Sequence, residues 1–256
     1  MKVAVIIPCL NVKNYIDNVI NEIPDYVNDI IVVDDFCPEN TGEYVLKKYS
    51  DNKKITVLVN EKNLGVGGAT LRGFKKAIEL KNDILVKIDG DGQMDSKILH
   101  KFVDPIKNFK TDYAKGNRFL NFKSISKMPY IRVFGNIFLS FLTKLSSGYW
   151  NLFDPTNGYI AINAKIFSEI EKSEIDNSFF FESDMLFRLY LIKAKVIDIP
   201  IQAIYNDSKS NLKIHKVILP FFFKNLFNFI KRILYEYFFL NFGYPGINLF
   251  LSIIFI

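Results

Sequence analysis

The stretch ILVKIDGDGQ, residues 84–93, indicates how the rest of the chain is organised. Its apolar first half, broken only by Lys87, predicts a buried strand. Gly90 and Gly92 follow directly and predict a sharp turn, because glycine adopts positive φ at little cost. The stretch therefore predicts a buried strand that ends in a polar turn.

Two carboxylates, Asp89 and Asp91, stand one residue apart on this turn. They can converge on one point in front of the sheet, and adjacent negative charges are costly unless a cation lies between them. Carboxylate oxygens suit Mg²⁺ or Mn²⁺, and Mg²⁺ commonly shares its coordination shell with substrate phosphates. The turn therefore predicts a metal site, although a plain Asp-Gly turn with solvated carboxylates explains these residues equally well when they are taken alone.

The amino-terminal part of the chain alternates strand and helix signals. Strands are expected at 3–7, 29–33, 55–59 and 84–88, and helices at 15–23, 41–49, 65–80 and 96–109. This alternation predicts a parallel sheet covered on both faces. Ligands of such sheets bind beyond the carboxyl ends of the strands. One shared site is therefore predicted from the polar features at four of these ends: Pro8, Asp34, the 60–68 loop and Asp89.

A dinucleotide-binding Rossmann domain is the main competing fold. It requires G-x-G-x-x-G directly after the first strand. Residues 8–11 instead read PCLN, and the first glycine of the chain is Gly42. The chain also has no Walker A sequence. The sequence therefore argues against a nicotinamide enzyme and a P-loop nucleoside triphosphatase.

The charge pattern favours a membrane over nucleic acid as the partner. The net charge is +6, and basic residues are dispersed until the last third of the chain, where they interleave with Phe, Ile and Leu. That pattern suits an anionic membrane surface. Cys9 and Cys37 lack metal-ligand spacing, which favours a reducing cytosolic setting. The chain begins with a strand signal instead of a signal peptide, so we expect the catalytic part to stay in the cytoplasm.

Six motifs occur in an order and spacing that resembles the family 2 glycosyltransferases. They are IIPCLN at 6–11, IIVVDD at 30–35, NLGVGGATLRGF at 63–74, KIDGDGQ at 87–93, KGNRF at 115–119 and DPTNGY at 154–159. Within that family the chain looks most like the dolichyl- or polyprenyl-phosphate branch, over residues 2–212. The resemblance implies an α/β GT-A fold with a mostly parallel central sheet. It also implies a metal-dependent, inverting transfer of a sugar from a nucleoside-diphosphate sugar to a lipid phosphate.

The resemblance further implies roles for individual residues. The nucleotide-sugar site would comprise Pro8, Asn11, Asp34, Asp35, Gly65, Gly67 and Asp89. The metal ligands would be Asp89, Asp91 and Gln93. Arg118 would meet phosphate charge, and the acceptor side would be lined by Asp154 and Asn157.

The chain departs from the family pattern at three places. Val12 stands where glutamate is common, and Asn117 stands where serine is common. The late R-x-x-G-x-S-K segment survives only as YNDSKS at 205–210, without its arginine, so that Lys209 is the cation expected there. We add Arg132 as a further cation for an anionic acceptor.

The chemistry of the acceptor decides whether a general base is needed. A phosphate monoester, with a second pKa of ~6, is largely ionised at neutral pH and needs cations that position it. A sugar hydroxyl would need a base, which Glu182 or Asp184 could supply. We therefore expect transfer from a UDP- or GDP-sugar to polyprenyl phosphate, with Asp91, Arg118 and Asp184 as the catalytic candidates. The alternatives are a family 2 enzyme that elongates a glycan with Asp184 as base, and a non-catalytic membrane scaffold. A homo-oligomer is compatible with the sequence.

Two stretches concern the membrane. Residues 130–145 carry an apolar stripe that predicts a core helix, with an interfacial helix as the alternative. Residues 213–256 are rich in Phe, and their basic residues precede the uncharged run that follows Glu236, as the positive-inside rule expects on the cytoplasmic side. The last apolar stretch, 247–256, is shorter than the ~20 residues that a span needs. We therefore expect a catalytic domain at 1–212 and a membrane-associated part at 213–256, with interfacial helices over 217–239 and the beginning of a membrane segment after them.

Overall fold

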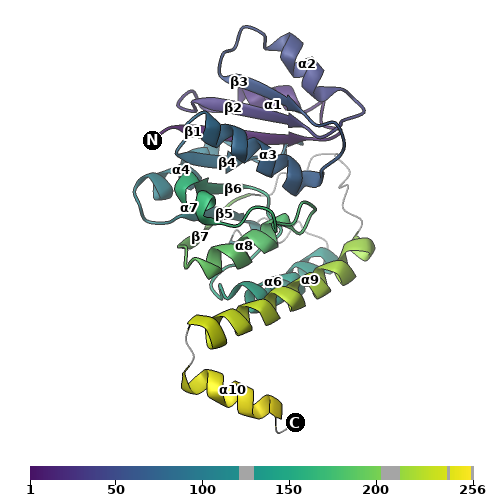
Figure 1. The fold of residues 1–256 in the computed structure, drawn as a ribbon. Coiled ribbons are helices and arrows are strands. Elements are labelled where there is room, and N and C mark those ends of the chain that lie inside the picture. Colours follow the sequence, from purple (N-terminus) through teal and green to yellow (C-terminus); the bar gives the residue numbers. More distant parts are fainter. Residues whose placement is uncertain (121–129, 203–213, 241–242, 255–256) are drawn as a thin grey trace.

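The computed structural model describes residues 1–120, 130–202, 214–240 and 243–254. Within these ranges the core is a seven-stranded sheet in the order β3-β2-β1-β4-β6-β5-β7 (Figure 1). The strands are β1 Val3–Cys9, β2 Asp29–Asp34, β3 Ile55–Val59, β4 Ile84–Lys87, β5 Tyr113–Asn117, β6 Ile160–Asn163 and β7 Val196–Pro200. The strands expected from the amino-terminal pattern are all present.

The sheet is mostly parallel, as predicted. Neighbouring strands run parallel from β3 to β4 and between β5 and β7. Among the described strands, β6 alone runs antiparallel to its neighbours, β4 and β5. This reversal matters for the site. Because β6 runs antiparallel, the residues that precede it lie beside the carboxyl ends of β4 and β5.

Helices cover both faces of the sheet, and alternation along β1 shows why. Val3, Val5 and Ile7 face one apolar cluster, whereas Ala4 and Ile6 face the other. The first cluster is completed by α1 Ile16–Asn21, α2 Thr41–Lys48 and α4 Leu99–Lys107. The second is completed by α3 Gly65–Glu79, α7 Ala164–Glu169 and α8 Phe181–Leu191. Such period-two burial on both faces is what a sheet between two helical layers requires.

Strand β1 continues through Pro8 to Cys9, beyond the expected end at residue 7. Its pairing with β4 stops at Ile6, opposite Lys87, whereas its pairing with β2 continues to Cys9. Proline has no backbone N–H to donate. It is accommodated here because the ladder with β4 has already ended.

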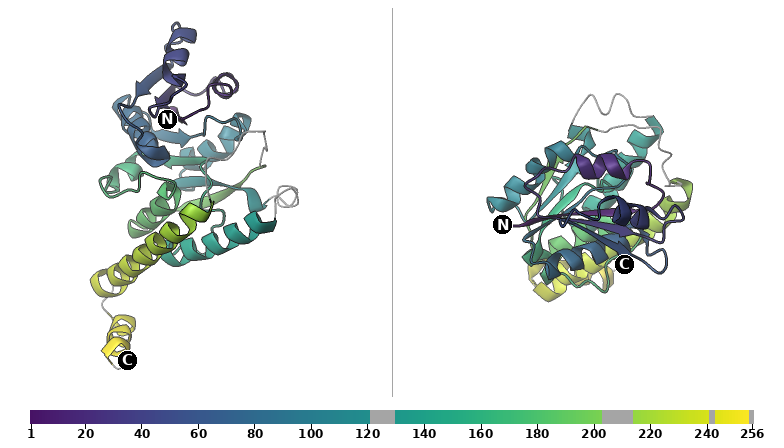
Figure 2. Two further views of the ribbon diagram at one scale, coloured as in Figure 1. Left: turned by 90° about the vertical axis from the view of Figure 1, so that its right-hand side faces the viewer. Right: turned by 90° about the horizontal axis from the view of Figure 1, so that it is seen from above.

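Two long helices, α6 Tyr130–Ser147 and α9 Ile214–Leu234, pack against each other beside α8 (Figures 1 and 2). Their polar side chains are buried: Asn136, Ser140, Thr143 and Ser147 of α6, and Asn225, Asn228 and Arg232 of α9. Many of their large apolar side chains are exposed, whereas Phe221 of α9 is buried. We call the following exposed residues the outer face: Phe134, Ile137, Phe138, Phe141, Leu219, Phe223, Phe227 and Ile230.

The prediction of a core helix over 130–145 is therefore wrong. The inner side of α6 is polar because its neighbours offer polar partners. Ser146 donates to the Asn225 side chain of α9 at 2.6 Å, and Arg232 of α9 donates to the Leu145 carbonyl at 3.0 Å. Apolar side chains on that side would leave these buried groups without partners, which is costly.

The chain after α9 continues as a π-helix, η3 Tyr235–Leu240, and ends in α10 Tyr244–Ile254. In Figure 1, α10 lies apart from the sheet and its helices. None of the helices in the described ranges combines the length and apolar character that a membrane crossing needs. The expected domain boundary at 212/213 lies outside the described residues.

Candidate functional site

The predicted site lies at one edge of the sheet, where the carboxyl ends of β1, β2, β4 and β5 meet. Ile160 at the start of β6 pairs with both Lys87 of β4 and Lys115 of β5. This register brings the 154–159 loop to the same edge as Asp89 and Arg118, which follow those two strands. The strand order therefore gathers motifs that lie far apart in the sequence.

A buried lysine links Asp89 to two other segments. The Lys87 side chain is 1% exposed, and its ammonium donates to Asp89 Oδ1 at 2.6 Å, Glu182 Oε1 at 3.2 Å and the Gly158 carbonyl at 3.2 Å. Burial disfavours the ammonium, but the Asp89 and Glu182 carboxylates outweigh it and raise the pKa of Lys87. Burial also raises the pKa of the Glu182 carboxyl, against the opposing charge of Lys87.

The turn after β4 has the conformation that its glycines predict. Gly92 has a φ of +72°, and the backbone N–H of Gln93 donates to Asp91 Oδ1 at 3.0 Å. Burial and the negative charge of Asp89 raise the pKa of the Asp91 carboxyl. In the part of the chain that the structure describes, no three His, Cys, Asp or Glu side chains form a metal-binding group. Two carboxylates and the Gln93 amide are oxygen ligands that fit a cation which also binds phosphate oxygens.

Arg118 is held by Asp154 of the loop before β6. Nε donates to Oδ2 at 2.7 Å, Nη2 to Oδ1 at 2.6 Å, and the backbone N–H of Arg118 to Oδ2 at 3.0 Å. Asn157 adds a fourth donor to the same carboxylate at 3.2 Å. Burial opposes ionisation of Asp154, but the Arg118 charge outweighs it and lowers the pKa of the carboxyl. Of the two predicted acceptor residues, Asp154 thus contacts the predicted phosphate-binding arginine, and Asn157 contacts Asp154.

Asp34 is buried and caps helix α2. Its carboxylate accepts from the backbone N–H groups of Cys37 at 2.7 Å and Gly42 at 2.6 Å. Asn40, the residue just before the helix, makes no side-chain cap hydrogen bond. A carboxylate from the preceding strand satisfies the helix terminus instead, which also suits the positive end of the helix dipole.

Asp35 is also buried and connects β2 to the loop before α3. Its Oδ1 accepts from Asn60 Nδ2 at 2.7 Å and from the backbone N–H of Leu64 at 2.8 Å. Pro8 is buried in β1, and Asn11 is exposed just beyond it with a φ of +57°. These predicted donor-side residues therefore border one edge, formed by the ends of β1 and β2.

The glycines at the start of α3 face a segment that the sequence analysis did not single out. Gly65 has a φ of +81°, and side chains at Gly65 and Gly67 would collide with the backbone carbonyls of Asn177 and Asp176. Gly68 donates its N–H to the Asn177 carbonyl at 3.1 Å. Their small size is thus required for close packing of α3 against residues 176–177.

Asp184 is buried in α8, and both of its carboxylate oxygens accept hydrogen bonds. Oδ2 accepts from the Asp176 N–H at 3.0 Å and from Arg188 Nε at 3.0 Å, and Oδ1 accepts from Asn228 Nδ2 of α9 at 2.9 Å. Lys224 of α9 pairs with Asp176. Asp184 thus joins α8 to α9, a geometry that favours a positioning role over that of a base.

Two predicted cations cannot be placed. The side chain of Arg132 lies outside the described residues, and so does Lys209 with the whole 205–210 segment.

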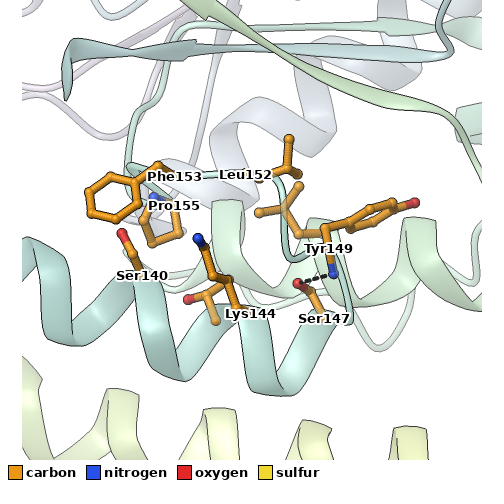
Figure 3. Close-up of a pocket in the computed structure, with 9 residues that line it drawn as sticks. Ser140, Lys144, Ser147, Tyr149, Leu152, Phe153 and Pro155 are labelled. Carbon is orange, nitrogen blue, oxygen red and sulfur yellow. Dashed lines mark hydrogen bonds between the residues drawn. The ribbon is translucent and has the colours of Figure 1, made fainter. Parts of the chain in front are cut away.

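A small pocket lies between α6 and residues 149–155 (Figure 3). Its lining combines Ser140, Thr143, Lys144, Ser147, Tyr149, Leu152, Phe153, Pro155 and Leu186. Its volume of about 10 Å³ holds roughly one water molecule, so it is too small for a sugar or a phosphate. The Lys144 amino group lies over the Phe153 ring, 5.3 Å from its centroid.

Comparison with known proteins gives consistent results. Residues 4–171 match the family Glycosyl transferase family 2. A UDP-N-acetylglucosamine–dolichyl-phosphate N-acetylglucosaminyltransferase of Methanococcus voltae is 32% identical, over 80% of this chain and 86% of that protein. An undecaprenyl-phosphate mannosyltransferase of Micrococcus luteus is 27% identical, over 78% of this chain and 83% of that protein.

Among solved structures, glucosyl-3-phosphoglycerate synthase from Mycobacterium tuberculosis, in complex with Mn²⁺, UDP and glucosyl-3-phosphoglycerate, has the same fold. The TM-score is 0.60 at 16% identity, over 90% of this chain and 79% of that one. TarS from S. aureus has a TM-score of 0.52 at 17% identity, over 93% of this chain and 75% of that one.

Proposed function

Because the chain belongs to glycosyl transferase family 2, we propose that it transfers a sugar from a UDP- or GDP-sugar to a polyprenyl or dolichyl phosphate, with inversion. The observation that carries the proposal is the convergence of the Asp89–Asp91 turn and Arg118 at one sheet edge. Two relatives named for transfer to dolichyl and undecaprenyl phosphate support a lipid phosphate as the acceptor.

On the donor side, Asp89, Asp91 and Gln93 would hold Mg²⁺ or Mn²⁺. Such an ion supplies Lewis-acid stabilisation of a leaving diphosphate. The structure of glucosyl-3-phosphoglycerate synthase, which has the same fold and was solved with Mn²⁺ and UDP, supports this choice of ion. Arg118, which Asp154 holds in a fixed orientation, adds charge-assisted hydrogen bonds to phosphate oxygens. Pro8, Asn11, Asp35, Gly65 and Gly67 would border the nucleotide.

On the acceptor side, the geometry suits a nucleophile that needs no base. A phosphate monoester is already largely ionised at neutral pH. The carboxylate of Asp184 is engaged by donors from three residues, and Glu182 is paired with Lys87. Arg118, together with Arg132 and Lys209, would orient the lipid phosphate by charge.

We further propose that the enzyme works at the cytoplasmic face of a membrane, on which the outer face of α6 and α9 rests. Its exposed apolar side chains are typical of helices that lie in an interface. Lys231 borders this face, with its amino group 4.8 Å from the centroid of the Phe227 ring. Ser140, on the buried side of α6, accepts from the backbone N–H of Asp154 at 3.3 Å. Helix α6 therefore contacts the proposed acceptor loop directly.

The test is a transfer assay with radiolabelled UDP- and GDP-sugars, polyprenyl phosphate and Mn²⁺. We expect the label to appear in organic-extractable lipid. This signal should disappear when the lipid phosphate is omitted. Label that appears only in a water-soluble glycan would replace the proposal with glycan elongation. No transfer from any donor would favour a non-catalytic scaffold.

A further inference from the structure

Lys87 is a charged residue at the buried carboxyl end of strand β4, where burial of an unpaired ammonium would be costly. All three of its N–H donors have acceptors: Asp89 on the following turn, Glu182 at the start of α8, and the Gly158 carbonyl. A side chain at Gly158 would collide with the Lys87 amino group and would approach Asp89 Oδ2 to 2.8 Å. The lysine is therefore built into the site by three separate segments.

This arrangement places a permanent positive charge against a proposed metal ligand. Asp89 Oδ1 is 2.6 Å from the Lys87 ammonium, so Lys87 and a divalent cation would share one carboxylate. Lys87 offsets one of the two negative charges of Asp89 and Glu182, which lowers the electrostatic attraction for a free cation at this turn. A diphosphate would bring additional negative charge and offset the repulsion from Lys87.

We propose that Lys87 tunes the metal site so that the divalent cation binds weakly alone and tightly together with the nucleotide diphosphate. This inference rests on the proposed function, because it needs a metal and a nucleotide at this edge. Lys87 acts here as a positioning and charge-tuning residue through Asp89, and Glu182 sets how much of its charge remains uncompensated. Metal entry with the donor, and metal departure with the released diphosphate, follow from this balance.

The experiment measures Mn²⁺ binding to the full chain at pH 7.5 by electron paramagnetic resonance, with and without UDP. Lys87→Met removes the positive charge and should tighten binding of free Mn²⁺ by about tenfold, the size expected of one nearby charge. Glu182→Gln removes a negative charge and should weaken it by about tenfold. The double variant Lys87→Met/Glu182→Gln restores the charge balance and should bind free Mn²⁺ within about threefold of the unchanged chain.

A second buried lysine provides the matched control. Lys115 of β5 is likewise 1% exposed and pairs with Asp198 at 2.9 Å. Lys115→Met should leave the Mn²⁺ affinity within about twofold, although it too removes a buried charge. If Lys87→Met does not fold, the double variant should still bind Mn²⁺ about tenfold more tightly than Glu182→Gln alone.

The outcomes separate this inference from the proposed function. The role of Lys87 would be overturned if free Mn²⁺ bound no more tightly to Lys87→Met than to the unchanged chain. It would also be overturned if free Mn²⁺ bound equally tightly to the double variant and to Glu182→Gln. Failure of the unchanged chain to bind UDP with Mn²⁺ would instead overturn the proposed function.

Discussion

Arg118 and Asp154 form a two-bond ion pair across the candidate site, with donor–acceptor distances of 2.7 and 2.6 Å. The Asp154 side chain is fully buried, whereas the Arg118 side chain is 23% exposed. The pair thus presents an arginine in a fixed orientation where a phosphate could approach it.

Arg118→Lys should reduce transfer by at least tenfold, because an ammonium cannot reproduce the planar two-bond contact with Asp154. Arg118→Ala should reduce it further and should also destabilise the fold. The loss of one partner leaves a buried charge uncompensated, and such changes cost up to about 3–5 kcal/mol. Steady-state kinetics below the melting temperature of each variant separate the two effects. Near-normal transfer by a folded Arg118→Ala variant would contradict the assigned role.

The same ion pair should make the stability of the fold depend on pH in the acidic range. Arg118 holds the pKa of the folded-state Asp154 below its ordinary value of about 3.9. The contribution of the ionised Asp154 to stability is therefore fully present above that ordinary value, and it is lost as the pH falls through the lowered pKa. Melting temperatures between pH 6 and pH 3 should fall less steeply for Asp154→Asn than for the unchanged chain. Parallel curves would contradict this prediction.

Asp91→Ala should abolish transfer and leave the melting temperature nearly unchanged, because a turn carboxylate contributes little to the core. EDTA should stop the reaction, and Mn²⁺ or Mg²⁺ should restore it. Asp95→Ala, which removes a carboxylate four residues away that accepts from the Lys97 N–H, is the matched control and should retain transfer. Substantial activity of Asp91→Ala, or of the EDTA-treated enzyme, would refute the metal site.

Asp184→Asn should lower the rate by less than about tenfold, since removal of a general base typically costs ~10²–10⁴-fold. It should lower the melting temperature, because an amide N–H₂ would face donors of Asp176, Arg188 or Asn228. Lipid-transfer rates and thermal unfolding of the same preparation test both parts. An inactive Asp184→Asn variant with intact folding would identify Asp184 as a base and favour a hydroxyl acceptor.

Phe223→Ser with Phe227→Ser on the outer face should weaken binding to anionic vesicles, because less apolar surface enters the interface. Higher salt should weaken the remaining electrostatic part, which is screened beyond ~8 Å at physiological ionic strength. Phe109, 77% exposed just after α4, is the control, and Phe109→Ser should not change binding. Vesicle flotation tests both variants; equal flotation of all three proteins would exclude the outer face as the docking surface.

The sequence by itself determined the features that depend on neighbouring residues. Period-two and helical spacing fix which segments become strands and helices, so the parallel half of the sheet and the turn at Asp89–Gln93 follow from local patterns. The ordered motifs likewise identified the family, because each motif reflects a fixed loop at a strand end. These inferences need no knowledge of which distant segments meet.

Only the tertiary structure decided which face of α6 is covered. An apolar stripe shows that two faces of a helix differ, but the neighbours determine which one is buried. Here Asn225 and Arg232 of α9 offer polar partners, so the polar face of α6 turns inward. The core-helix prediction failed for that reason.

The partner of Lys87 was equally hidden in the sequence. Glu182 lies 95 positions away, and only the packing of α8 against the end of β4 brings the two charges to 3.2 Å. Asp154 meets Arg118 only because β6 runs antiparallel between β4 and β5. Local sequence specifies which groups carry charge, but their partners depend on strand order and helix packing, which contacts between distant residues decide.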